Sequence, residues 1–311
     1  MDRLIKQEDI PISLWKKKEG TLILPYYLLE SWKLILEKRN LLKTATEERG
    51  DGETGGINEE ATHKHYSFRY NGSCARFQLT FLDPKNELKD VSNAFVKCLA
   101  GNDVFIADIP SGTGAASLSL LCNIAQLREE NILPRIPLKV KILAGEISQT
   151  AIEIFQHSFE EMNAYFKTQS IEVELKIKEW DVQDADSTSQ LIKEITIFSN
   201  NSTNKILLLT NFTGFLEQDR KWKEVKDKFE EIFRHFSGQS TIAIWLEPKM
   251  GNVLTQFWPR TIKWFTDVFK NLIGAKENIN IETSHANYEH GLRDGILRTN
   301  VAVVKFNTER E

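Results

Sequence analysis

One short segment constrains the fold more than any other part of the 311-residue chain. The apolar run Val104 to Ala107 ends in Asp108 and continues as I-P-S-G-T-G, so a buried strand enters a tight turn at Gly112 and Gly114. Because glycine has no Cβ, it adopts unusual backbone conformations and lets a ligand approach the main chain. The free N–H groups of a following helix favour a carboxylate or phosphate. The segment therefore predicts a ligand site at the carboxyl end of a strand.

Strand and helix patterns alternate along the rest of the chain, which indicates an α/β fold with a doubly wound sheet. Strands are predicted at Val104 to Ala107, Val140 to Ala144, Ile171 to Ile177, Ile206 to Thr210 and Thr241 to Leu246. Helices with one apolar stripe separate them, as in the series Ile152, Phe155, Phe159, Met162 and Phe166, and the series Trp222, Val225, Phe229, Ile232 and Phe236.

The last two predicted strands, Ile279 to Thr283 and Ile296 to Phe306, have no helical pattern between them. Strands joined without a crossover helix are expected to pair antiparallel. We therefore expect a seven-stranded, mostly parallel sheet with the last strand antiparallel and helices on both faces. The polar segment His285 to Arg298 is expected to form a loop between these two strands.

The N-terminal part differs in composition from the rest and suggests three regions. An amphipathic helix that includes Trp32 is expected from about Pro25, within an N-terminal helical extension of residues 1–43. Residues 44–62 hold four glycines and many acids with almost no large apolar side chain, which indicates a flexible linker or loop. Residues 63–311 are expected to form the ligand-binding domain, with a helix at Asp90 to Leu99.

Composition excludes several classes of protein. No stretch reaches the roughly 20 apolar residues that a membrane helix needs, and the N-terminus lacks the apolar core of a signal peptide, so we expect a soluble cytoplasmic protein. The three cysteines, Cys74, Cys98 and Cys122, have no zinc-ligand spacing and are expected to be buried free thiols; no metal site is predicted. The formal net charge of -4 gives no global attraction to nucleic acid.

The segment D-I-P-S-G-T-G resembles motif I of the class I S-adenosylmethionine-dependent methyltransferases, usually written D-x-G-x-G-x-G, with Pro110 in place of the first glycine. The resemblance implies a Rossmann-like fold, S-adenosyl-L-methionine as the cofactor, and a cofactor loop formed by Pro110, Ser111, Gly112 and Gly114. It also places Asp108 near the amino group of the cofactor.

The same resemblance assigns roles to three later strand ends. Glu146, followed by Ile147, would bind the two ribose hydroxyls, since a carboxylate accepts both hydrogen bonds. Asp181 would contact the exocyclic amine of adenine beside Val182, and Asn211 with Phe212 would face the transferable methyl group. Each acid taken alone is equally explained as a surface residue or a helix cap.

The methyl acceptor leaves no decisive motif. Strand four ends in T-N-F-T, which is neither the N-P-P-Y type tetrad of adenine or glutamine methyltransferases nor a Pro-Cys dipeptide for covalent cytosine chemistry. Because methyl transfer depends chiefly on proximity and alignment, no catalytic residue is assigned. Substrate contacts are predicted at Arg69, Tyr70, Arg76, His285 and Arg298, although helix packing and solvated loops explain the same residues.

The segment Y-S-F-R-Y-N-G-S-C-A-R that ends at Arg76 resembles ribosome-associated methyltransferases of the mitochondrial small-subunit type. This resemblance favours RNA as the acceptor over protein or a small molecule. The run Lys16 to Lys18 offers a contact surface for nucleic acid, but three lysines are also a common solvated surface feature. The oligomeric state is left open.

Two alternatives belong to other functional classes. A nicotinamide-dependent oxidoreductase is suggested by G-T-G-A-A-S, yet Ser117 occupies the third glycine position and Glu146 lies 34 residues after Gly112 rather than the usual ~20. A non-catalytic cofactor-binding or scaffold protein with the same fold is also compatible with the sequence, because the fold does not fix the function.

Overall fold

The computed structural model of the chain describes residues 3–47, 58–100, 103–217, 221–236, 240–249, 263–264 and 281–307. Its strands are β1 (Trp15–Lys16), β2 (Thr21–Leu22), β3 (Asp103–Asp108), β4 (Leu138–Glu146), β5 (Ile171–Glu179), β6 (Asn204–Thr210), β7 (Thr241–Glu247), β8 (Ile281–Glu289) and β9 (Ile296–Asn307). Its helices are η1 (Gln7–Asp9), α1 (Tyr26–Lys38), α2 (Leu42–Thr46), α3 (Glu59–Leu82), α4 (Lys89–Leu99), α5 (Ala115–Glu129), α6 (Gln149–Thr168), α7 (Ala185–Phe198), α8 (Thr213–Glu217) and α9 (Trp222–Phe236).

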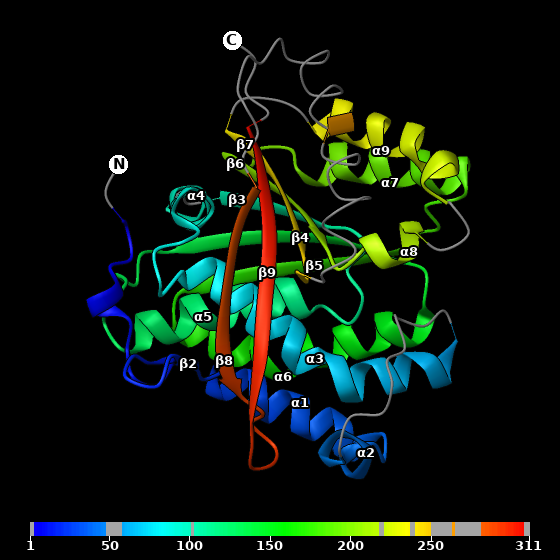
Figure 1. Cartoon of the computed structure of the whole chain (residues 1–311). Coiled ribbons are helices and arrows are strands. Elements are labelled where there is room, and N and C mark those ends of the chain that lie inside the picture. The colour runs from blue at the N-terminus through cyan, green and yellow to red at the C-terminus, as the bar shows by residue number, and fades with distance from the viewer. Residues whose placement is uncertain are drawn as a thin grey trace.

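All the described strands join one mixed sheet in the order β1-β2-β8-β9-β7-β6-β3-β4-β5 (Figure 1). The run from β5 to β7 is parallel, and β9 pairs antiparallel with both β7 and β8, as the sequence predicts. The predicted count of seven strands is wrong, because the described residues alone form a sheet of nine. The two additional strands are two-residue segments that extend the edge beyond β8, where Thr21 and Leu22 pair with Asn287 and Tyr288.

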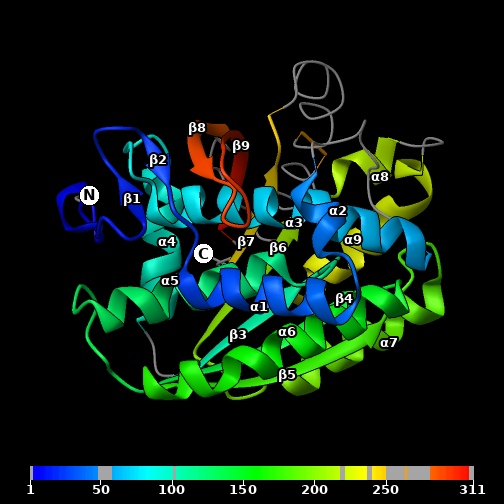
Figure 2. The ribbon, with the colours of Figure 1, turned by 90° about the horizontal axis from the view of Figure 1, so that it is seen from below.

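The sheet separates two hydrophobic cores because consecutive side chains of a strand point to opposite faces. In β3, Val104 and Ile106 join the core that α1, α3, α4, α5 and α6 cover, whereas Phe105 and Ala107 join the core under α7, α8 and α9. Figure 1 shows these two groups of helices on either side of the strands, and Figure 2 shows α1 lying along α6. Burial on both faces explains the continuous apolar runs in the parallel strands.

The 24-residue helix α3 is the main departure from the sequence-based expectation for the N-terminal third. It begins inside the predicted linker of residues 44–62, where Asn58 caps its N-terminus by accepting a hydrogen bond from the Ala61 N–H. The helix α2 also falls partly within that range, and residues 48–57 lie outside the described residues. The division into regions 1–43, 44–62 and 63–311 stays a prediction.

The N-terminal segment packs onto the rest of the molecule. The predicted amphipathic helix is confirmed as α1, which starts after Pro25 and buries Leu28, Trp32 and Ile35. Before it, the guanidinium of Arg3 forms an ion pair with Asp83 and donates to the Leu82 carbonyl at 2.6 Å. This contact fixes the start of the described chain to the end of α3.

The segment from His285 to Arg298, expected to be a loop, is mostly strand. β8 runs to Glu289 and β9 starts at Ile296, so only residues 290–295 form the turn. Ser284, Ala286 and Tyr288 are buried while His285 and Asn287 are exposed. The exposed side chains of β8 are polar, and this polar composition led to the prediction of a loop. Buried and exposed residues nevertheless alternate along the segment, as in a half-buried strand.

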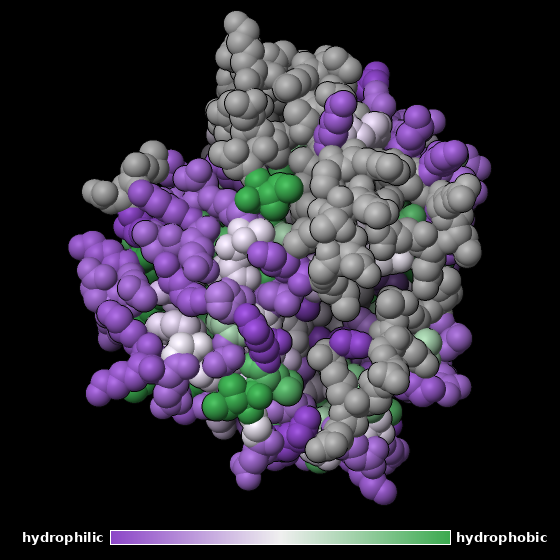
Figure 3. All heavy atoms as spheres, viewed as in Figure 1, coloured by the Kyte–Doolittle hydropathy of each residue, from purple (hydrophilic) through white to green (hydrophobic). Residues whose placement is uncertain are grey.

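On the face shown in Figure 3, the described surface is mainly hydrophilic, with small separate hydrophobic groups. None of the helices within the described ranges is long and apolar enough to cross a membrane. The three cysteines are free and buried, as predicted.

Candidate functional site

A cavity of about 430 Å³ lies at the carboxyl ends of β3, β4, β5 and β6, beside the first half of α3. Ligand sites in open parallel sheets occur at this edge. The cavity lining includes most of the predicted cofactor residues, namely Pro110, Ser111, Gly112, Glu146, Ile147, Asp181, Val182, Asn211 and Phe212, and the predicted substrate residue Tyr70.

The glycine-rich turn forms the floor of the cavity. Gly112 and Gly114 have φ angles of 53° and 80°, in the left-handed region that favours glycine. A Cβ on Gly112 would meet nothing within 4 Å, whereas a Cβ on Gly114 would lie 2.3 Å from a ring carbon of Phe155. Gly112 is therefore required by the turn, and Gly114 by the turn and by close packing against α6. Ala115, which begins α5, lines the cavity at the end of the turn.

Glu146 links the turn to the end of β4. One carboxylate oxygen accepts a hydrogen bond from the Gly112 N–H at 2.9 Å, and the other accepts from the Ser148 N–H at 2.9 Å. Burial raises the pKa of Glu146, and the hydrogen bonds from backbone N–H groups partly offset this effect. A carboxylate has about four acceptor positions, so both oxygens keep the capacity to bind a ligand.

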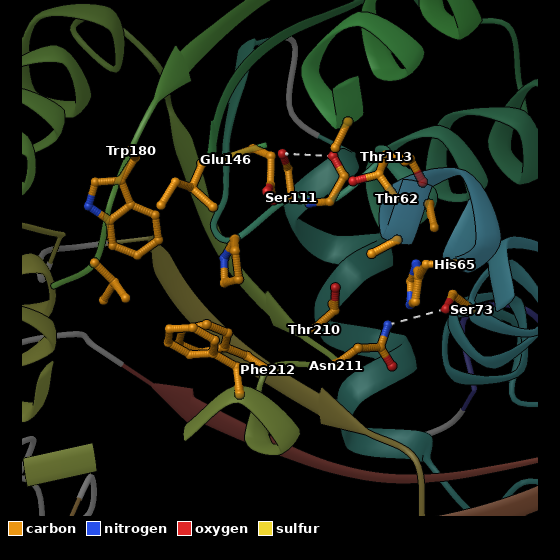
Figure 4. A pocket seen from close by; sticks show the side chains of 18 of the residues that line it. Thr62, His65, Ser73, Ser111, Thr113, Glu146, Trp180, Thr210, Asn211 and Phe212 are labelled. Atoms are coloured by element: carbon orange, nitrogen blue, oxygen red, sulfur yellow. Dashed lines mark hydrogen bonds between the residues drawn. The ribbon is translucent and has the colours of Figure 1, made fainter. Parts of the chain in front are cut away.

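The third strand end forms one wall. Trp180 is buried and donates from its ring N–H to the Thr188 hydroxyl, while its backbone N–H donates to the Glu146 carbonyl at 3.0 Å. Asp181 and Val182 follow it and also line the cavity. Figure 4 shows Trp180 beside Glu146, at the opposite end from His65 and Ser73. An apolar wall next to two carboxylates suits a flat, polar-edged ring.

The loop after β6 brings Asn211 and Phe212 to the cavity. Asn211 has a left-handed φ of 56°, which asparagine tolerates better than most residues, and its N–H donates to the Leu246 carbonyl. The buried carboxylate of Glu247 accepts from the N–H groups of Phe212 and Thr213 at 2.7 and 2.9 Å. Glu247 thus braces this loop from beneath and does not line the cavity.

Much of one wall of the cavity was missed by the sequence analysis, which selected Tyr70 there but not Asn58, Ala61, Thr62 or His65. The residues that line it follow helical spacing from the N-cap of α3 into the helix: Asn58, Ala61, Thr62, His65, Tyr70 and Ser73. The signal was a polar stripe with intervals of three to five residues, hidden because its beginning lies in a segment of loop-like composition. Figure 4 shows Thr62, His65 and Ser73 on the α3 side of the cavity.

Two predicted cofactor residues do not line the cavity. Gly114 contacts Phe155 instead, and Asp108 lies beneath the turn with no exposed surface. The Asp108 carboxylate accepts a hydrogen bond from the Ser117 hydroxyl at 2.6 Å, and burial raises its pKa to about 7. The structure therefore gives Asp108 a contact within the protein, between β3 and the first turn of α5.

The remaining predicted substrate residues also lie outside the cavity lining. Arg69 and Arg76 are on α3 and half-buried, while His285 and Arg298 are exposed on β8 and β9. Arg76 nevertheless reaches the site indirectly, because it donates to the side-chain oxygen of Asn211 at 2.6 Å. Over the described ranges, no group of three or more histidine, cysteine, aspartate or glutamate side chains is placed to hold a metal ion.

Comparisons with known proteins show only distant likeness. No protein-family model matches the chain, and no curated protein matches its sequence. Precorrin-6y C5,15-methyltransferase from Geobacter metallireducens is 9% identical, with a TM-score of 0.36 over 70% of this chain and 88% of that one. A protein described as a class I S-adenosylmethionine-dependent methyltransferase from Listeria monocytogenes is 12% identical, with a TM-score of 0.32 over 90% and 87%.

Human N-acetylserotonin methyltransferase in complex with SAM is 10% identical, with a TM-score of 0.27 over 89% of this chain and 70% of that one. All three TM-scores are below 0.5. The functional assignment therefore rests on the residues of the cavity.

Proposed function

We propose that the chain is an S-adenosylmethionine-dependent methyltransferase that binds its cofactor in the cavity described above. The observation that carries this proposal is Glu146, a cavity-lining carboxylate that joins the glycine turn to the end of β4. The cavity thus brings together two features: the Glu146 carboxylate, which can accept from ribose hydroxyls, and the N-terminus of α5, which favours a carboxylate. These are the groups that an amino-acid nucleoside needs.

The residues present fit the parts of such a molecule. Glu146 would accept from the ribose hydroxyls, and Asp181 beside Val182 would bind the adenine edge and face. The turn at Gly112 and the start of α5 would hold the amino-acid end. When bound, the cofactor supplies an activated methyl group on a sulfonium sulfur, and the chain's own contribution is to align the acceptor with it.

The buried acid beneath the turn argues against the nicotinamide alternative. Asp108 lies under the N-terminus of α5, where a dinucleotide would place its doubly negative pyrophosphate. A carboxyl group with a pKa of about 7 at that position carries part of a negative charge at neutral pH and repels the pyrophosphate. A zwitterionic amino acid has an ammonium group that such an acid attracts.

Calorimetric titration tests the proposal. The purified full chain is titrated separately with S-adenosylmethionine, S-adenosylhomocysteine and NADH. We expect saturable binding of the first two ligands and none of NADH. Binding of NADH alone would replace this function with the oxidoreductase alternative. Binding of the first two without methyl transfer to any acceptor would favour a non-catalytic cofactor-binding protein. The preference for RNA as the acceptor stays a prediction from the sequence.

A further inference from the structure

The side-chain amide of Asn211 is held in one orientation. Arg76 donates from Nη1 to Asn211 Oδ1 at 2.6 Å, and an arginine has only donors, so the atom it contacts must be the amide oxygen. The guanidinium is itself fixed on its other side, because its Nε donates to the Asn300 carbonyl at 3.1 Å. The two contacts connect α3, β9 and the loop after β6.

With its oxygen engaged, Asn211 presents its NH₂ group to the cavity. Nδ2 donates to the Ser73 hydroxyl at 3.4 Å, a long hydrogen bond, and its second hydrogen remains to be shared with a ligand. Figure 4 shows this contact at the end of the cavity where His65, Ser73 and Thr210 gather. The backbone of Asn211 is fixed by the Leu246 carbonyl, and Glu247 braces the following residues. The donor is therefore preorganised.

A fixed donor discriminates among methyl acceptors by the number of their lone pairs. An amino nitrogen has one lone pair, which must attack the methyl carbon, so a hydrogen bond from Asn211 would compete with the reaction. A hydroxyl oxygen has two lone pairs and can accept from Asn211 with one while it attacks with the other. In an N-P-P-Y type tetrad the asparagine hydrogen-bonds the amino group of its acceptor, so the orientation seen here is the opposite of what an amino acceptor needs.

We propose that Arg76 is a positioning residue that fixes Asn211 as a hydrogen-bond donor, and that the site takes a hydroxyl oxygen rather than an amino nitrogen as its methyl acceptor. The inference rests on the proposed function. The acceptor oxygen forms its bond to the methyl carbon as the carbon–sulfur bond breaks, and that electron pair stays on sulfur. The hydroxyl proton passes to the imidazole of His65, a cavity-lining base at the same end.

The test uses phenol and aniline, two probes with the same ring that are both neutral at pH 7. The ¹⁵N-labelled full chain is saturated with S-adenosylhomocysteine, and the side-chain NH₂ signals of Asn211 are assigned from their loss in Asn211→Asp. We expect phenol to shift these signals. With S-adenosylmethionine in place of S-adenosylhomocysteine, we expect methyl transfer to phenol to be about fivefold faster than to aniline, because the hydrogen bond from Asn211 must break before the aniline nitrogen can attack.

Arg76→Met frees the amide to rotate, so the preference for phenol should fall to near one. Lys97→Met, which removes an exposed cation on α4, is the matched control and should keep the preference. If circular dichroism shows that Arg76→Met does not fold, Arg76→Lys replaces it, since lysine keeps a charge but loses the planar fork.

The proposed function and the preference for a hydroxyl acceptor are contradicted by different results. Calorimetry on the same samples reports whether S-adenosylhomocysteine binds, and if it does not, the proposed function falls and this inference falls with it. If S-adenosylhomocysteine binds but methyl transfer to aniline is as fast as or faster than transfer to phenol, or if neither probe shifts the Asn211 signals, only the present inference is overturned. An unchanged preference for phenol in Arg76→Met would remove Arg76 from its positioning role.

Discussion

The two glycines of the glycine-rich turn should respond very differently to the same small change. Gly114→Ala places a methyl group 2.3 Å from Cδ2 and 2.5 Å from Cε2 of Phe155, a fully buried ring, at a φ of 80°. The left-handed backbone costs about 1–2 kcal/mol for alanine, and overpacking of a dense core adds about 1–3 kcal/mol. Gly112→Ala has the same backbone cost at a φ of 53° but open space around the new methyl group.

Chemical denaturation followed by circular dichroism measures both effects as changes in the free energy of unfolding. We expect Gly114→Ala to lose about 2–5 kcal/mol and Gly112→Ala about 1–2 kcal/mol. Phe155→Leu combined with Gly114→Ala should lose less than the sum of the single variants, since the two positions share one contact. Equal losses at Gly112 and Gly114, or strict additivity with Phe155→Leu, would refute the assignment of Gly114 to packing.

Two further predictions concern buried charges. Burial raises the pKa of Asp108 to about 7 from 3.8, so the folded wild type holds a proton that the unfolded chain has lost, and stability falls as the pH rises from about 4 to 7. Asp108→Asn should abolish this fall in stability, which amounts to at most ~4 kcal/mol. Melting temperatures measured from pH 4 to 8 test this, and the same pH dependence in wild type and variant would contradict the raised pKa. Arg3→Met leaves the buried carboxylate of Asp83 without its ion pair and should cost about 3 kcal/mol in urea denaturation, whereas a loss under 1 kcal/mol would show that the N-terminal contact is weak.

The parallel strands could be predicted because burial on both faces makes their sequences continuously apolar. The expected strand at Val140 to Ala144 lies inside β4, and that at Thr241 to Leu246 lies inside β7, with errors only at the ends. Their parallel direction could be anticipated, because helices between strands require parallel crossovers. The edge strands β1 and β2 could not, since two residues leave no periodic pattern.

The helix α3 escaped sequence-based prediction for a physical reason. Its buried face mixes polar side chains such as Ser67, Asn71 and Gln78 with apolar ones, so its apolar stripe is diluted. These groups are accommodated by tertiary hydrogen bonds, as when Gln78 donates to the Ile23 carbonyl at 2.8 Å and Asn71 to the His290 carbonyl at 3.3 Å. Such partners lie far away in sequence and cannot be read from local spacing.

The site shows the same division between local and distant information. Glu146, Asp181 and Asn211 could be selected because each follows a predicted strand, and the carboxyl ends of parallel strands share one edge. His65 could not be selected, because it reaches the cavity only through the path of α3. Asp108 follows a strand too, but its carboxyl group is directed to Ser117 beneath the turn, a distinction that a sequence does not contain.

The role of Glu146 offers the most direct test of the account. Calorimetric titration with S-adenosylhomocysteine would compare the wild type, Glu146→Gln and the control Glu179→Gln, an exposed acid at the adjacent end of β5. Loss of a charged acceptor for the ribose should weaken binding about 10- to 100-fold in Glu146→Gln and leave Glu179→Gln unchanged. Equal affinities for all three proteins, or no binding by the wild type, would contradict a cofactor site built around Glu146.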